Sequence, residues 1–166
     1  MEKHEAGHAS HDMAMKGNSH YVKFWISLAV NAVLMFVLMF VMIDTFAEFI
    51  PNINFVYMAL CMAAPMGIVM LASMPMMYSD KRKNMISYTV LILLFVGSFA
   101  FIRNQTFVGN GGFLASMIPH HSGAILMCRK ARITDPEIVA LWKNIETSQR
   151  QEIDEMKAIQ ARHPKG

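Results

Sequence analysis

Three long apolar segments constrain the fold of this 166-residue chain more than any other feature. They run from about Phe24 to Ile43, from about Phe55 to Met77 and from about Ile86 to Ile102. Each is close to the ~20 residues that a helix needs to cross a bilayer, and the third is the shortest. A buried soluble helix is the alternative, but the first two segments lack charged residues and together exceed a small soluble core. The sequence therefore predicts an all-α protein with three transmembrane helices in residues 22–103.

The first apolar segment is predicted to be an uncleaved span. It is longer than the ~7–15-residue core of a signal peptide, and no small-x-small cleavage site closes it. Asp44 and Glu48 follow it instead. Only 16% of the residues are charged, against about 25% in a typical soluble domain. We therefore expect a multi-pass protein of the cell membrane.

The distribution of Lys and Arg predicts how the spans are oriented. Lys16 and Lys23 lie before the first span, and the basic run 81–83 lies between the second and third. These segments share one side of the membrane, while the loop 44–54 on the other side has no Lys or Arg. Because basic segments stay in the cytoplasm, residues 1–21 are predicted to form a cytoplasmic tail. The C-terminal region is then extracytoplasmic, in the periplasm.

The C-terminal region is predicted to be an antiparallel helical hairpin over residues 112–162. A polar, Gly-rich linker over residues 104–112 precedes it. Thr134 and Glu137 are spaced as in a capping box, with Thr at the cap and Glu at the third helical position. Pro136 is tolerated in a first helical turn. We therefore expect the turn of the hairpin near Thr134.

Spacings of three and four predict which faces of the hairpin pair. The first helix offers Met117, His120 or His121, Ala124, Met127 and Cys128, and the second offers Trp142, Ile145, Gln149, Glu152, Met156 and Ile159. Antiparallel pairing sets His120 opposite Gln149 and Glu152, which are expected to orient a ligating imidazole. It sets Met117 opposite Glu152 and Met156. Because two helices bury little surface, we expect a homodimer that completes a four-helix bundle.

The segment Met117-Ile118-Pro119-His120-His121 places two imidazoles and a thioether within about one helical turn. Imidazole suits copper and zinc, and thioether sulfur selects for Cu(I). The chain has 17 Met and seven His but only two Cys, which favours copper as the bound metal. The candidate metal ligands are Met117, His120, His121, Met127 and Met156.

Other interpretations of these ligands remain open. Adjacent side chains diverge by about 100° on a helix, so His120 and His121 share a groove only where a helix begins. Pro119 is compatible with such a start. Otherwise one His lies in the core and one on the surface. Met127 and Met156 are either ligands or core residues, since Met commonly fills gaps in a core.

The same region resembles a known family. Residues 113–127 read F-L-A-S-M-I-P-H-H-S-G-A-I-L-M, and residues 145–156 read I-E-T-S-Q-R-Q-E-I-D-E-M. They are similar to the M-I-P-H-H and Q-x-x-E-I-x-x-M signatures of the domain-of-unknown-function family three hundred and five. This resemblance covers roughly residues 110–160 and implies a ferritin-like helical domain, exported or periplasmic and associated with copper. Ser122 stands where the family often has Gln, and no Trp follows Met156.

Methionine also recurs in the spans. A stripe at every fourth residue of the second span comprises Met58, Met62, Met66, Met70 and Met74, and Met35, Met39 and Met42 of the first span could face it. The stripe resembles, in part, the Met-x-x-x-Met helix of the three-span eukaryotic copper transporters, whose trimers ring a pore with thioethers. The alternative is that these residues only pack a lipid-embedded helix.

The N-terminal tail is rich in His and Met. Its candidate residues are His4, His8, His11, Met13, Met15 and His20. Their spacing would align the first three His if the tail became helical on binding metal. Without metal, its polar composition predicts an unstructured, solvated segment.

Several classes of function have no support in the sequence. The hairpin contains no Glu-x-x-His motif of a di-iron site, and the chain shows no nucleophilic triad, phosphate loop or basic nucleic-acid patch. Cys61 and Cys128 lie on separate elements and predict no disulfide. We therefore expect a non-enzymatic, membrane-anchored copper-binding protein for copper sequestration, sensing or handover. The alternatives are a Cu(I) channel that uses the Met stripe and a membrane scaffold with no metal role.

Overall fold

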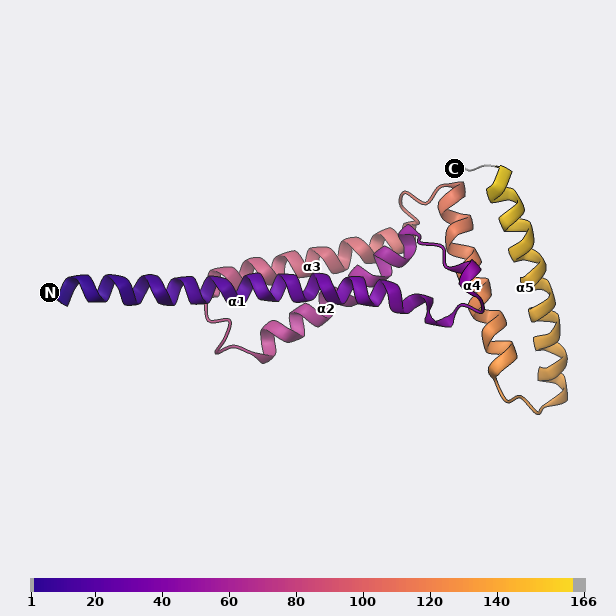
Figure 1. Ribbon diagram of the computed structural model, residues 1–166, viewed down its shortest axis with the longest axis horizontal. Coiled ribbons are helices and arrows are strands. Elements are labelled where there is room, and N and C mark those ends of the chain that lie inside the picture. Colours follow the sequence, from indigo (N-terminus) through magenta and orange to yellow (C-terminus); the bar gives the residue numbers. More distant parts are fainter. Residues whose placement is uncertain (1, 163–166) are drawn as a thin grey trace. The chain divides into compact units, whose positions relative to one another are not determined.

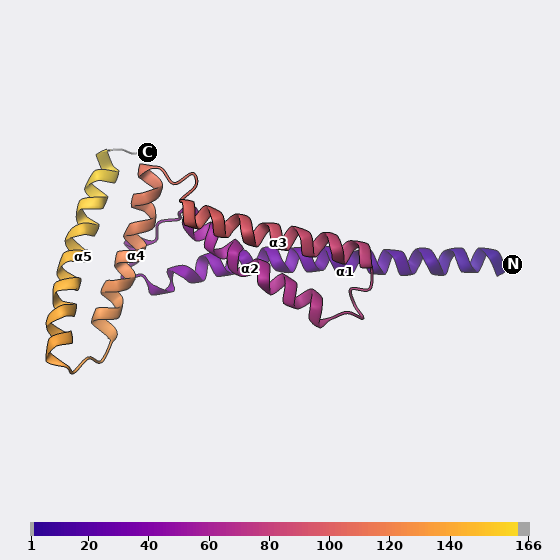
Figure 2. The same ribbon diagram turned by 180° about the vertical axis from the view of Figure 1, so that it is seen from behind.

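The computed structural model describes residues 2–162, with side chains from Ser19 onward (Figures 1 and 2). Its elements are α1 (Glu2–Leu38), the short 3-10 helices η1 (Met39–Met42) and η2 (Phe46–Glu48), α2 (Ile53–Ser73), α3 (Lys81–Asn104), α4 (Asn110–Lys130) and α5 (Pro136–Arg162). Within the described residues every regular element is a helix. The predicted all-α fold is therefore confirmed.

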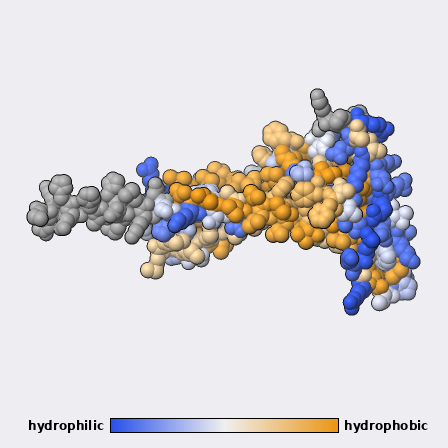
Figure 3. Space-filling view, in the orientation of Figure 1, coloured by the Kyte–Doolittle hydropathy of each residue, from blue (hydrophilic) through white to orange (hydrophobic). Residues whose placement is uncertain are grey.

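Three of the helical segments are long and apolar enough to cross a membrane. They are Ser19–Met42, Ile53–Ser73 and Lys81–Asn104, with mean hydropathies of 2.4, 2.1 and 2.3. In the space-filling view, apolar surface extends along these helices (Figure 3). Side chains that face hydrocarbon must be apolar, so this surface is the one expected of membrane helices.

The backbone of α1 is helical from Glu2 onward, so the prediction of an unstructured N-terminal tail is wrong. Starting a helix is costly, whereas each residue added to an existing helix gains one hydrogen bond. The tail has no proline before the first span, and nothing in its sequence therefore stops the helix from extending into it.

The chain divides into two compact units. The span unit comprises Met1–Met35 and Met58–Ala100, and the hairpin unit comprises Phe36–Tyr57 and Phe101–Gly166. The hairpin unit thus contains the two C-terminal helices together with the loop that joins α1 to α2.

In the span unit, α2 packs through small residues. Ala63 and Gly67 are buried, and a Cβ on Gly67 would lie 3.0 Å from a methyl carbon of Leu91 and 3.2 Å from one of Leu28. Small residues let membrane helices approach closely, because lipid offers no hydrophobic driving force between helices. The described core around this contact consists of Tyr21, Phe24, Leu28, Ala63, Leu71, Tyr78 and Leu91.

This packing predicts that Gly67→Val destabilises the span unit, whereas Gly97→Val does not overpack it. A Cβ at Gly97 would meet nothing within 4 Å, so it is the matched control. Overpacking typically costs about 1–3 kcal/mol. Thermal unfolding of both variants in detergent micelles measures the difference, and equal melting temperatures would contradict the close approach at Gly67.

In the hairpin unit, α4 and α5 lie side by side and run antiparallel (Figures 1 and 2). Their buried apolar cluster consists of Leu114, Ile118, Ile125, Ile153 and Met156, and Ile50, Met117 and Ile159 pack against it. The predicted antiparallel hairpin is therefore present, and its core is a single strip along the helix interface.

Two helix starts differ from the prediction. The helix α4 begins at Asn110 after the cap Gly109, so Pro119 lies inside it and marks no helix start. The cap of α5 is Asp135 rather than Thr134, because Asp135 Oδ1 accepts hydrogen bonds from the backbone N–H of Glu137 and of Ile138, at 2.9 and 3.1 Å. A cap bonds the second and third helical N–H groups, and Asp135 occupies that position once Pro136 is the first helical residue.

Candidate functional site

His121 is the candidate ligand in the hairpin whose two ring nitrogens both have polar partners. Its ring is buried, with Nδ1 2.9 Å from the backbone oxygen of Met117 and Nε2 2.7 Å from Oε2 of Glu152. The carbonyl can only accept a hydrogen bond, so Nδ1 carries a proton and donates. This bond fixes the ring and directs Nε2 across the interface toward α5. A backbone carbonyl on the other ring nitrogen is the usual support of a metal-ligating His.

A proton lies between His121 and Glu152. An ionised carboxylate accepts only, so either Nε2 donates and the ring is cationic, or Glu152 is protonated and donates to Nε2. A cation that replaced this proton would meet the Nε2 lone pair and the carboxylate together. The half-exposed Glu152 side chain provides access from solvent.

Met117 and Met156 lie one helical turn away from this pair. In an antiparallel pair, a step of four residues back along α4 matches a step of four residues forward along α5. The step from His121 to Met117 and the step from Glu152 to Met156 therefore reach one level. Met156 is buried, and Met117 packs against the same cluster. An imidazole, a carboxylate and two thioethers thus come from two adjacent turns of the interface.

His120 occupies a different position from the one predicted. It is exposed, and its ring centroid is 6.0 Å from that of His121. The prediction that His120 faces Gln149 and Glu152 is wrong, because His121 contacts Glu152 instead. With α4 continuous through Pro119, the spacing from Ile118 and Ile125 aligns His121 with the buried face. One buried and one exposed His is thus the arrangement observed.

Two further predicted residues, Met127 and Gln149, differ in burial. Met127 is 54% exposed and lies outside the buried face. Gln149, one turn before Glu152 on α5, has a buried Oε1 with no hydrogen-bond partner. A buried oxygen without a donor is costly, and a bound cation or water near the Glu152 side would satisfy it.

The candidate ligands form no closed site of hard donors. Within residues described in the structure, no three His, Cys, Asp or Glu side chains converge in a metal-binding group. The set around His121 depends on sulfur for additional donors. Its chemistry therefore fits a thiophilic metal rather than Ca²⁺ or Mg²⁺, which take oxygen ligands.

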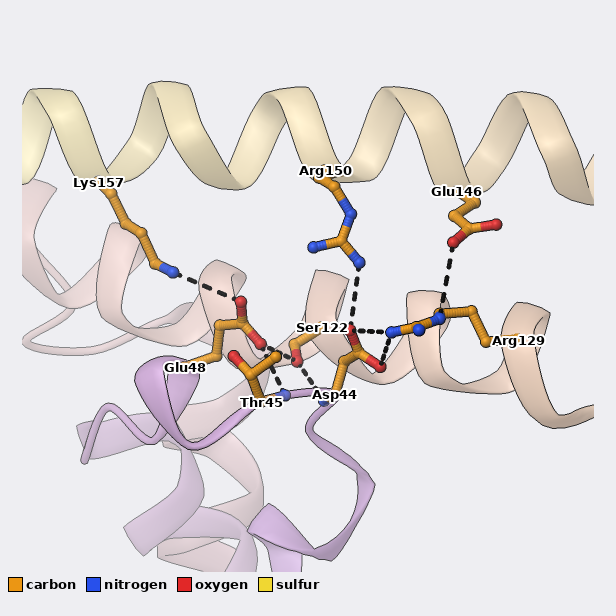
Figure 4. A network of polar contacts seen from close by, with 8 residues as sticks. All are labelled: Asp44, Thr45, Glu48, Ser122, Arg129, Glu146, Arg150 and Lys157. Carbon is orange, nitrogen blue, oxygen red and sulfur yellow. Dashed lines mark hydrogen bonds and ion pairs between the residues drawn. The ribbon is translucent and has the colours of Figure 1, made fainter.

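A second polar cluster attaches the hairpin to the loop between α1 and α2 (Figure 4). The side chains of Asp44 and Glu48 in this loop are each only 5% exposed. Both oxygens of Asp44 lie 3.0 Å from Arg129 Nη1, and Arg150 Nη2 is 3.1 Å from Oδ2. Lys157 Nζ is 3.4 Å from Oε1 of Glu48. We call these residues and Ser122 the loop clamp.

Ser122 lies at the centre of the loop clamp and is fully buried. Its Oγ donates to Oε2 of Glu48 at 2.7 Å and accepts from the backbone N–H of Asp44 at 2.6 Å. The same Glu48 oxygen accepts from the backbone N–H of Thr45 at 3.0 Å, which caps η2. A small side chain with a hydroxyl group suits this position, because Ser122 is buried where α4 meets the loop and its Oγ bonds two groups of the loop.

These bonds determine the ionisation of Glu48. Burial by itself raises its pKa, but the hydrogen bonds from Ser122 and Thr45, with the charge of Lys157, outweigh burial and lower the pKa below the ordinary value. The carboxylate is thus held in its charged form. Sequence reasoning noted Asp44 and Glu48 only as charges that follow a span. One charge pattern in the sequence was compatible with the clamp. The loop 44–54 is acidic and has no Lys or Arg, whereas the hairpin carries Arg129, Arg150 and Lys157.

The loop clamp predicts that Glu48→Gln loosens the hairpin unit at neutral pH. A pKa lowered by folding gives stability that is present above the unfolded carboxyl pKa of about 4.3 and is lost as pH falls through the folded value. Losing the charge-assisted bonds costs about 1–3 kcal/mol. Amide hydrogen exchange in α4 and α5 should therefore be about tenfold faster or more in the variant at pH 7.

The difference between the parent and Glu48→Gln should shrink as the pH falls through the lowered pKa of folded Glu48, because the parent then also loses its carboxylate charge. Exposed Glu155 on α5 supplies the matched control, and Glu155→Gln should behave as the parent does. Unchanged exchange in Glu48→Gln at pH 7 would show that the clamp does not hold the hairpin.

Comparison with known proteins places the hairpin in a family. Residues 108–162 match the family described as Domain of unknown function (DUF305), which confirms the predicted relationship for about a third of the chain. The domain thus defined comprises α4, α5 and their connection. No solved structure matches this chain.

About two thirds of the chain is similar to the uncharacterized protein L153 of Acanthamoeba polyphaga mimivirus. The two are 36% identical over 111 residues, which are 65% of this chain and 70% of the viral protein. The chain therefore belongs to the same family as that protein, and its C-terminal hairpin is a DUF305-type domain.

Proposed function

We propose that the protein is a membrane-anchored copper-binding protein that sequesters, senses or hands over copper in metal homeostasis. The observation that carries this proposal is the pairing of His121 with Glu152 one helical turn from Met117 and Met156. The spans hold the hairpin at the membrane. The Lys and Arg distribution supports an orientation with the hairpin outside the cytoplasm, in the periplasm.

The donor set favours copper. His121 presents Nε2 because Met117 holds Nδ1, and imidazole accepts Cu(I), Cu(II) and Zn²⁺ alike. The thioethers of Met117 and Met156 restrict this choice, since soft sulfur selects Cu(I). In this proposal Glu152 lies beside Nε2 at 2.7 Å, and its carboxylate balances the charge of the ion. Exposed His120, next in sequence, is placed to deliver or receive the metal.

Exposed apolar residues support a homo-oligomer built through the hairpin. Met127, Ile138 and Leu141 lie near the connection of α4 to α5 and are half-exposed or more. A hairpin with one strip of buried side chains has little core of its own. A second copy that covers these residues would make the four-helix bundle expected from the sequence.

A Cu(I) channel is the second candidate function, and the position of the Met stripe favours it. Met58, Met62 and Met66 are exposed, whereas the buried face of α2 carries Ala63 and Gly67. These three side chains are therefore accessible in the single chain, whereas Met70 of the same stripe packs against the core. In an oligomer the three exposed thioethers would line a shared path for Cu(I). Copper flux into liposomes, with Met62→Leu and Met66→Leu as the test variant, separates transport from binding.

The hairpin site is tested by Cu(I) titration of the full-length protein in nanodiscs against a competing chelator. We expect His121→Ala to weaken one copper equivalent by on the order of 100-fold, since even the loss of supporting contacts costs 10–100-fold. Exposed His120→Ala is the matched control and should change affinity by only about threefold. Acidification should weaken the same equivalent, because protons compete for the imidazole.

Two results would overturn this assignment. If His121→Ala binds copper as tightly as the parent, then the hairpin interface is not the site. If the parent binds no copper at all, then the protein has no metal role and the membrane scaffold becomes the better account.

A further inference from the structure

Three methionines occupy the turn that follows α2. The helix ends at Ser73, and the next residues are Met74-Pro75-Met76-Met77. The turn is closed by hydrogen bonds to the Met74 oxygen from the backbone N–H groups of Met77 and Tyr78, each 3.1 Å long. The side chains of Met74, Met76 and Met77 are 47%, 96% and 38% exposed.

Packing within the chain does not account for these methionines. Tight turns favour Gly, Pro, Asn, Asp and Ser, and among these four residues only Pro75 follows that preference. Met usually fills irregular gaps in a core, but Met76 is almost entirely exposed. The thioethers of the turn are thus accessible in this chain.

The turn is anchored on its C-terminal side. Tyr78 is buried, and its ring packs edge-on against Tyr21 and Phe24, with centroids 5.4 and 5.7 Å apart. Asn84 Nδ2 donates a 2.6 Å hydrogen bond to the backbone carbonyl oxygen of Tyr78. A turn fixed in this way loses less conformational entropy on binding a ligand than a free loop would.

We propose that Met74, Met76 and Met77 bind a Cu(I) ion through their thioether sulfurs. Residues 74 and 77 close one turn, which brings their Cα atoms within about 7 Å, and the three rotatable bonds of Met let the sulfurs converge. A set of soft sulfur ligands selects Cu(I) over Zn²⁺. Met70 lies one helical turn before Met74, so the site terminates the Met stripe of α2. The inference rests on the proposed function only for the identity of the metal.

The experiment compares full-length variants in nanodiscs, titrated with Cu(I) against a competing chelator. The test variant carries Met74→Leu, Met76→Leu and Met77→Leu, since Leu and Met have similar volume. Met85→Leu, also exposed but on α3, is the matched control. We expect the triple variant to lose one copper equivalent, the control to lose none, and Zn²⁺ to leave this equivalent unoccupied.

The outcomes separate this site from the hairpin site. Loss of one equivalent in the triple variant, with a different equivalent lost in His121→Ala, supports two sites. Loss in the triple variant alone supports the turn and overturns the hairpin assignment. If the triple variant keeps every equivalent while retaining its circular dichroism spectrum, the turn binds no copper and its methionines only contact the lipid surface.

Discussion

Two carboxylates in one short loop, Asp44 and Glu48, are buried against the C-terminal hairpin. Charged groups removed from water must be paired and hydrogen-bonded, and here the partners come from the other helices of the hairpin unit. Arg129 and Arg150 pair with Asp44, and Lys157 pairs with Glu48. The position of α4 and α5 therefore depends on the loop between α1 and α2. Removing one partner would leave a buried charge unpaired, which is the costly case.

This dependence gives a physical reason for the small residue Ser122 in this chain. Ser122 follows the two imidazoles directly and bonds both the Glu48 side chain and the Asp44 backbone. His121, one residue before it, points to α5. Neighbouring residues of α4 thus make different contacts: Ser122 bonds the loop, and His121 faces the proposed copper site.

The fold was largely predictable because the sequence patterns that indicate it extend over many residues. Apolar runs near the length of a bilayer-spanning helix, and a C-terminal pattern with spacings of three and four, leave few alternatives to three spans and a hairpin. The error at Pro119 had a local cause: proline is compatible with a first turn but is also accommodated inside α4. That error shifted the expected facing residue from His121 to His120, since neighbours on a helix diverge by about 100°.

The loop clamp was not predictable in the same way. Its contacts join loop and hairpin residues that lie 74 to 109 positions apart in the chain, and isolated Asp, Glu, Arg and Lys on a surface are usually solvated. Only the tertiary arrangement shows that Asp44 and Glu48 are buried. The sequence likewise did not predict which methionines of the Met stripe are exposed, because a period of four residues does not say which face of α2 meets α1 and α3.

X-ray absorption at the copper edge identifies the ligands of the hairpin site, in a protein loaded with one equivalent of Cu(I) and carrying Met74→Leu, Met76→Leu and Met77→Leu. We expect one imidazole nitrogen and sulfur scatterers at about 2.3 Å, a typical metal–sulfur distance, with the imidazole signal lost in His121→Ala. A spectrum with no imidazole contribution, or one unchanged by His121→Ala, would contradict a copper site at the interface of α4 and α5.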